Sequence, residues 1–147
     1  MIDVVKVCSA LSSLAKEQIP ELAQVYMEVQ PQEIQRPSLL VWVKSWKAED
    51  TTHELIQVNG ELLITVFPSE DAAPDEILAF RQKAVDLFRL GYIRVDGRAL
   101  KATAQIGGEN QTADQVSVQL TFFDDREKVS DPLPVMETID TRMDLKG

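Results

Sequence analysis

The sequence has 147 residues, of which 44% are hydrophobic, and a formal net charge of −9. A chain of this size can form one domain with a single core, and its negative charge disfavours sequence-independent binding to nucleic acid. It has no apolar run of the ~18 residues that a transmembrane helix requires, so we expect no membrane association. Its one cysteine excludes an intramolecular disulfide and a zinc site made of cysteines alone, and suits a reducing compartment.

The first predicted element is a helix over Asp3–Gln18, ended by Pro20. Its apolar side chains recur every three or four residues and so share one face. This stripe consists of Val4, Val7, Cys8, Leu11, Leu14 and Ala15. Because charged residues interrupt the apolar run from its start, we expect an amphipathic helix here and not a signal peptide. The thiol of Cys8 is expected to be buried and inert.

The stretch Pro37–Pro68 is expected to form a hairpin at the centre of the fold. Its two arms, Leu39–Trp46 and Glu54–Phe67, alternate with a period of two residues and are apolar on both faces near their centres. Such strands belong inside a sheet that is covered on both faces. We expect the polar run Lys47–His53 to connect the arms. A shorter strand, Gln24–Val29, precedes the hairpin.

Asn59–Gly60 lies inside the second arm and leaves two interpretations open. Asn-Gly is a strong signal for a two-residue hairpin turn, which would split the arm into a short hairpin of its own. Alternatively, Gly60 marks a bulge in one long strand. We favour a bulge or a twisted, protruding hairpin.

Strict alternation places the two tryptophans of the first arm, Trp42 and Trp46, on the same face of the strand. The opposite face carries Leu39, Val41 and Val43. We expect Trp42 to lie in the core. Trp46 is nearer the exposed end of the hairpin, where it would either pack in the core or contact another subunit, because aromatic residues are enriched at interfaces.

The second half of the chain predicts a helix followed by strands. Pro74–Leu90 has an apolar stripe and acidic residues in its first turn, and Gly91 follows at the position where a left-handed residue commonly ends a helix. The strands expected after it are Tyr92–Val95, Ala99–Ile106 and Gln115–Phe123, the last with one face exposed to solvent.

These elements predict an α+β fold with a mostly antiparallel sheet and two helices packed on one face. Their order is helix, three strands, helix, and then two or three strands. We expect a single domain over residues 1–125. Residues 126–147 contain two prolines, several charges and few bulky apolar side chains, which predicts an extended or mobile C-terminal tail.

The sequence contains no recognised catalytic or phosphate-binding motif. His53 is the only histidine, and no nucleophile or orienting carboxylate accompanies it at a recognisable spacing, so we expect a solvated loop residue. An acidic cluster, Glu70, Asp71, Asp75 and Glu76, lacks the spacing and the glycine of a calcium loop and instead suits the start of a helix. We expect no enzyme activity, no cofactor and no metal.

Three segments of the sequence carry a family resemblance. They are Gln35-Arg36-Pro37 leading into Ser38–Val43, Leu62–Phe67 closed by Pro68 ahead of an acidic helix, and Val95-Asp96-Gly97 followed by a strand ending Leu120-Thr121-Phe122-Phe123. Together they resemble the tail terminator, or tail completion, proteins of long-tailed bacteriophages and prophages. The resemblance extends over most of residues 1–125 and is closest to the small acidic type from phages of Gram-positive bacteria. Residues 129–147 have no counterpart in it.

The resemblance implies a structural protein without catalytic residues. Its subunits would form a ring, usually hexameric, that caps the tail tube protein and joins it to the head-tail connector protein. DNA would pass through the ring without specific binding. The protein would be located in the virion tail and, during assembly, in the host bacterial cytoplasm. The alternatives are another head-tail joining protein, or an α+β domain that binds a small ligand.

On this interpretation, the far end of the hairpin is the candidate contact with a neighbouring subunit or with the tail tube. The residues expected to make that contact are Trp46, Lys47, His53, Glu54, Ile56 and Val58. A ring suits such a hairpin, because strand edges that a free monomer must protect can pair across subunits.

Overall fold

The computed structural model describes residues 2–107 and 114–125, and within them it shows two helices and one six-stranded sheet. The elements in chain order are α1 (Val4–Gln18), β1 (Gln24–Met27), β2 (Ser38–Asp50), β3 (Leu55–Phe67), α2 (Pro74–Asp86), β4 (Tyr92–Val95), β5 (Arg98–Ile106) and β6 (Gln115–Asp125). The predicted α+β fold and its element order are confirmed. The predicted C-terminal tail, residues 126–147, lies outside the described residues.

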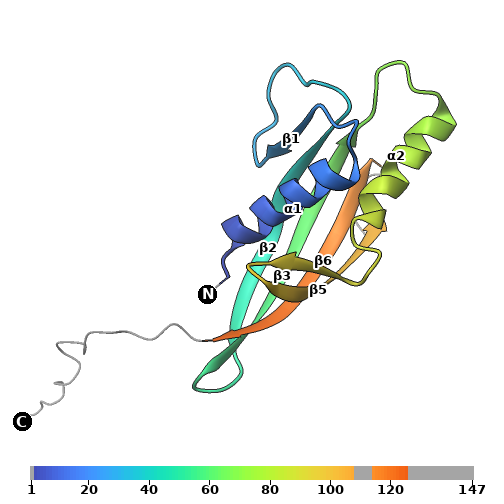
Figure 1. The fold of residues 1–147 in the computed structure, drawn as a ribbon. Coiled ribbons are helices and arrows are strands. Elements are labelled where there is room, and N and C mark those ends of the chain that lie inside the picture. The colour runs from blue at the N-terminus through green and yellow to red at the C-terminus, as the bar shows by residue number, and fades with distance from the viewer. Residues whose placement is uncertain (1, 108–113, 126–147) are drawn as a thin grey trace, which may run out of the picture.

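The sheet has the strand order β1-β2-β3-β6-β5-β4, so β3 and β6 are its central strands. Every neighbouring pair is antiparallel except β1 and β2, which run parallel with Val25 opposite Leu39. Both helices lie on the same side of the sheet (Figure 1). We call this the helix side and the opposite side, which carries Trp42, Leu63, Ser117 and Thr103, the outer face.

Helix α1 forms where the sequence predicts it. The Asp3 carboxylate caps its first turn by accepting a hydrogen bond from the backbone N–H of Lys6 at 2.9 Å. Its buried residues include Leu11 and Ala15 from the predicted stripe, and Cys8 is also buried. Burial raises the pKa of the Cys8 thiol, and the negative charge of Glu28 raises it further. The thiol is therefore protonated at neutral pH, as expected of an inert cysteine.

Helix α2 is shorter than predicted, because it ends at Asp86 and not at Leu90. Beyond it the chain continues in tighter turns, in which Phe88 N–H donates to the Val85 carbonyl and Gly91 N–H to the Phe88 carbonyl. Phe88 is still buried in these turns. The apolar periodicity therefore extends past the helix, and Gly91, with a φ of 82°, turns the chain into β4.

Strands β2 and β3 form a long antiparallel hairpin. β2 runs further than predicted toward the tip, so residues 47–50 belong to this strand and not to the connection, whereas β3 begins one residue later than predicted, at Leu55. Asn59–Gly60 makes no turn, since β3 continues through it from Leu55 to Phe67. The irregularity lies instead in the partner strand, where a β-bulge between Val43 and Ser45 shifts the register. The expected bulge thus exists, but on the strand opposite Gly60.

The bulge overturns the predicted placement of the two tryptophans. Inserting one extra residue into a strand moves every later side chain to the other face. Trp46 therefore lies on the helix side with Val43, packed against the core, whereas Trp42 lies on the outer face and is 36% exposed. The predictions that both share one face and that Trp42 is a core residue are wrong.

Candidate assembly surfaces

The far end of the β2–β3 hairpin extends beyond the helices (Figure 1). Of the six residues predicted to make contacts there, Lys47, His53 and Glu54 are exposed. The other three face the helix side: Ile56 and Val58 are 7% and 3% exposed, and Trp46 is partly buried. The structure thus brings the six residues into one hairpin end but divides them between an exposed tip and a buried support.

Trp46 holds the hairpin end against the rest of the domain. It pairs across the strands with Gly60, and a Cβ atom built on Gly60 would lie 2.8 Å from Cε3 of the indole. On its other side the indole meets the ring of Phe122 in β6, with centroids 6.1 Å apart and planes tilted by 57°. Glycine in a strand can signal close approach of another group, and here the indole takes the space of the missing side chain.

A second anchor of this end is the buried carboxylate of Asp124, which sequence reasoning missed. It accepts hydrogen bonds from Ile2 N–H at 2.7 Å, from Asp125 N–H at 2.8 Å and from the Arg98 guanidinium at 3.0 Å. Burial on its own raises the pKa of this carboxyl, but the backbone hydrogen bonds and the charge of Arg98 outweigh it, and the net shift is downward. The carboxylate joins the chain before α1, the β4–β5 hairpin and the end of β6.

The free edge of β2 begins where β1 ends. Glu28 has a φ of 64°, and while its backbone N–H donates to the Val41 carbonyl, its carboxylate accepts from Val43 N–H at 2.7 Å. The side chain thus occupies the position that the next residue of β1 would take. Beyond it, no strand among the described residues pairs with the outer edge of β2 over Ser45–Glu49. Such an edge can accept another chain.

The outer face of the sheet carries no helix of the described chain, and its middle is polar but largely uncharged. Its uncharged polar side chains are Gln57, Asn59, Thr65, Thr103, Gln105, Gln115, Ser117, Gln119 and Thr121. The same face also carries Trp42, Leu63 and Phe123 and the cation Lys101. The Thr121 hydroxyl donates to the Asn59 side-chain oxygen at 3.0 Å, and Lys44 forms an ion pair with Glu61. The acidic charge of the chain is therefore not concentrated on this face.

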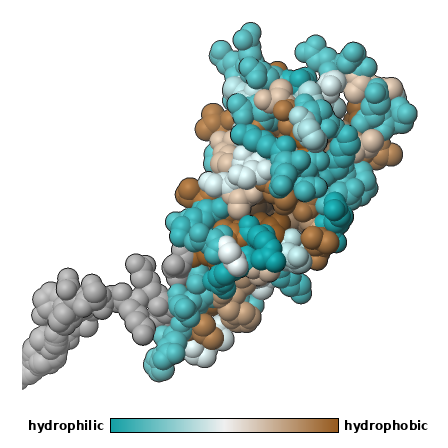
Figure 2. Space-filling model, in the orientation of Figure 1, coloured by the Kyte–Doolittle hydropathy of each residue, from teal (hydrophilic) through white to brown (hydrophobic). Residues whose placement is uncertain are grey.

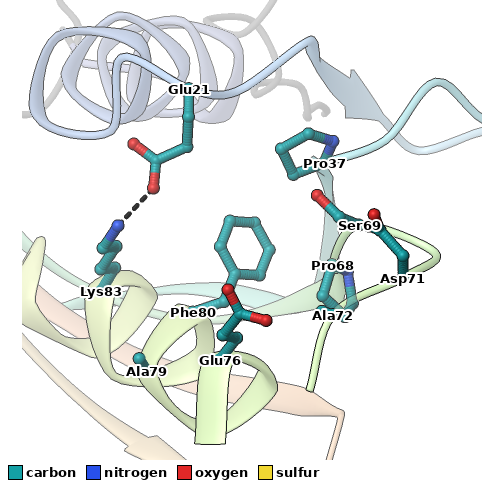
Figure 3. A pocket seen from close by; sticks show the side chains of 10 residues that line it. All are labelled: Glu21, Pro37, Pro68, Ser69, Asp71, Ala72, Glu76, Ala79, Phe80 and Lys83. Carbon is teal, nitrogen blue, oxygen red and sulfur yellow. Dashed lines mark hydrogen bonds and ion pairs between the residues drawn. The ribbon is translucent and has the colours of Figure 1, made fainter. Parts of the chain in front are cut away.

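The helix side has a different surface. Figure 2 shows hydrophobic residues near the middle of this side and mostly hydrophilic residues over the end where α2 begins. That end holds an open pocket of about 310 Å³ between the start of α2, the chain before β1 and the turn after β3 (Figure 3).

Three of the four charged side chains that line this pocket are engaged with one another or with the backbone. Lys83 forms an ion pair with Glu21, which lowers the pKa of the Glu21 carboxyl mainly through their hydrogen bond. Glu76 accepts a hydrogen bond from Ala73 N–H at 2.8 Å and so caps α2. The residues that line the pocket include Ser69 but no histidine or cysteine.

Within residues 2–107 and 114–125, no group of three or more His, Cys, Asp or Glu side chains is arranged to hold a metal ion. No described helix is long and apolar enough to cross a membrane.

The geometry is that of a structural module with a protruding hairpin, open strand edges and a bare sheet face. Comparison with known proteins agrees with this class. The family described as "Phage tail terminator protein" matches residues 6–132, and the chain belongs to that family. This membership supports a structural, tail-capping role and a location in the virion tail, as the family resemblance of the sequence implies. The comparison with curated proteins finds no match.

Among solved structures, the fold is similar to a chain described as "Cryo-EM Structure of an Extracellular Contractile Injection System, PVC sheath/tube terminator in extended state". The TM-score is 0.60 at 9% sequence identity, and the match covers 89% of this chain. Similarity at this identity establishes a shared fold. The match covers 59% of that terminator chain, so the present chain corresponds to little more than half of its length.

Proposed function

We propose that this protein forms a homo-oligomeric ring that caps the tail tube and presents a surface to the head-side connector. The proposed ring has six subunits, the number that the family resemblance implies. The observation that carries the proposal is the β2–β3 hairpin, which extends past the helices with an unpaired β2 edge. In a closed ring, an edge that is open in one subunit can be covered by the next. Family membership and the shared fold support the same role.

The exposed end of the hairpin makes the contact in this proposal. Lys47, His53 and Glu54 lie at its surface together with Leu55, an apolar residue that is 36% exposed. Trp46, Ile56 and Val58 support the contact from beneath, because their side chains pack on the helix side. On contact, the exposed leucine would bury apolar surface, and the charged residues around it would orient the partner.

The outer face of the sheet lines the channel of the proposed ring. DNA in such a channel meets mostly uncharged amide and hydroxyl groups, together with two cations, Lys101 and Arg94, that have no ion-pair partner among the described residues. A surface without a cluster of Lys and Arg does not neutralise phosphates and so does not retain the duplex.

Light scattering during size-exclusion chromatography, with and without purified tail tubes, tests the proposal. We expect a ring in solution or on the tubes, and tubes of uniform length in its presence. A protein that stays monomeric with tubes present and leaves their length uncontrolled contradicts it. Binding to empty capsid portals in place of tubes would favour the head-tail joining alternative.

A further inference from the structure

The outer face of the sheet ends in opposite charges at its two margins. Residues directly across from one another on neighbouring strands form a row, with the strands ~4.8 Å apart. One row starts with Glu49 on β2 and passes through Gln57 on β3 to Phe123 on β6. The register of β5 with β6, continued by two residues, sets Ala99 beside Phe123, and Arg94 of β4 is opposite Ala99. A carboxylate therefore ends this row at one margin and a guanidinium ends it at the other.

Both end groups of the row are open to solvent. The Glu49 side chain is 52% exposed, and its carboxylate forms an ion pair of 3.1 Å with Lys47, whose side chain is 70% exposed. An ion pair so open to water contributes little to stability, so this carboxylate can engage a second cation at little cost. Arg94 is exposed, lies 5.9 Å from the centroid of the Tyr92 ring, and has no ion-pair partner among the described residues.

The neighbouring row has ends that are also compatible with each other. It runs from Lys47 on β2 to Tyr92 on β4, through Asn59, Thr121 and Lys101. An ammonium group is attracted to the face of an aromatic ring. Neither row therefore sets like charges against each other if its two ends meet.

A ring brings such ends together, because one margin of each subunit meets the opposite margin of the next in a heterologous contact. The outer edge of β2 has no partner over Ser45–Glu49, and β4 is the last strand at the other side of the sheet, among the described residues. When two subunits lie side by side with their outer faces toward the same channel, each row continues across the boundary. Glu49 of one copy then lies beside Arg94 of the next.

We propose that an ion pair between Glu49 of one subunit and Arg94 of the next closes the ring, with the end of the β2–β3 hairpin against the β4 margin. This contact rests on the proposed ring and names the surface that receives the hairpin. It sets the direction in which the subunits follow one another, since the acidic margin of each copy accepts the basic margin of its neighbour. It also neutralises Arg94 at the channel wall, which leaves less positive charge to hold DNA.

Charge reversal and its rescue test the proposal in the full chain. Glu49→Arg and Arg94→Glu are compared with the wild type by light scattering over a range of protein concentrations, with tail tubes present. Each variant alone sets like charges at every boundary, so half-maximal assembly should need a protein concentration at least ~10-fold higher than the wild type. An equimolar mixture should restore assembly, because alternating subunits bring opposite charges together in a ring with an even number of subunits.

The matched controls are Glu70→Arg in the turn after β3 and Arg89→Glu in the turns after α2, two exposed charges that belong to neither margin. Each control should assemble like the wild type. Wild-type rings together with normal assembly of Glu49→Arg and Arg94→Glu overturn the ion pair and leave the ring standing. A loss of assembly that the mixture does not restore also overturns it. A wild type that forms no ring on the tubes overturns the proposed function, and this contact with it.

Cross-linking measures the direction of the contact and leaves both charges in place. Ala48→Cys and Ala99→Cys are introduced together in the full chain with Cys8→Ser, since both alanines are exposed and each is next to one end of the row. A flexible bismaleimide should join them into a ladder of products up to the closed ring, whereas either cysteine alone should give no ladder. Cross-linked dimers without larger products would show a two-fold contact between two copies and overturn the proposal.

Discussion

Trp46 and Gly60 face each other across β2 and β3, and the indole of one occupies the space that a side chain on the other would need. A Cβ atom at Gly60 would lie 2.8 Å from Cε3 and 2.9 Å from Cζ3 of the ring. This contact sets the hairpin against the core, because the same indole packs on Phe122. The exposed tip of the hairpin is thus fixed to the domain by the partly buried contact of Trp46 with Gly60 and Phe122.

Gly60→Ala should destabilise the fold by about 1–3 kcal/mol, the usual cost of overpacking a fitted contact. Denaturant unfolding measures it. In a Trp46→Leu background the same change should cost much less, because the smaller side chain leaves room for the methyl group. Equal costs in the two backgrounds would show that the indole does not set the requirement for glycine.

Trp46→Ala should reduce the free energy of unfolding by about 3 kcal/mol, through lost burial and the cavity left beside Phe122. Trp42→Ala is the matched control on the same strand and should cost less than about 1 kcal/mol, since its side chain is on the outer face. Circular dichroism during urea unfolding compares them. A larger loss for Trp42 than for Trp46 would contradict the observed faces.

Asp124→Asn should cost about 1–3 kcal/mol, because the buried hydrogen bonds from Ile2 and Asp125 and the charge of Arg98 lose their carboxylate. The same group predicts the effect of acid. Its pKa is lowered in the folded protein, so its contribution is present above about pH 4, the ordinary value for aspartate, and is lost as pH falls through the folded pKa. Stability of the wild type should therefore fall more steeply below pH 4 than that of Asp124→Asn. Parallel pH profiles would exclude this role.

Thr103→Lys and Gln119→Lys together would place two cations on opposing positions of the outer face. If that face lines the channel, phage particles that carry the variant should assemble but release their DNA more slowly, with an effect that weakens as salt rises. The control is Lys16→Glu, which changes charge on an exposed part of α1. Unchanged release in the double variant would place the outer face away from the channel.

Much of the fold could be predicted because its signals are local. The helical stripe around Leu11 and the clean alternation of β6 require only a few neighbouring residues to be read. The parallel pairing of β1 with β2 could not be predicted, since the two strands are consecutive in the chain and parallel neighbours usually need a connection of about a dozen residues or more. The bulge in β2 could not be predicted either, because the residue types at Lys44 and Ser45 do not indicate one.

The candidate contact site was harder to predict, because it depends on contacts between strands and not on local sequence patterns. A single inserted residue puts Trp42 and Trp46 on opposite faces, and the space that the Trp46 indole fills lies on the neighbouring strand at Gly60. The buried role of Asp124 has no local signal, because its partners, Ile2 and Arg98, are separated from it by 122 and 26 residues. The exposure of His53, in contrast, is confirmed, because a polar run between apolar arms is a local signal.

The most direct test of the central claim is ring formation by a variant altered only at the hairpin tip. Leu55→Asp changes an exposed apolar side chain, and the matched control is Leu78→Asp, an exposed leucine on α2. Light scattering with tail tubes present should show the control assembling like the wild type, while Leu55→Asp remains monomeric with a wild-type circular dichroism spectrum and unfolding midpoint. Normal rings and normal tube length with Leu55→Asp would contradict the claim that the hairpin tip joins the subunits.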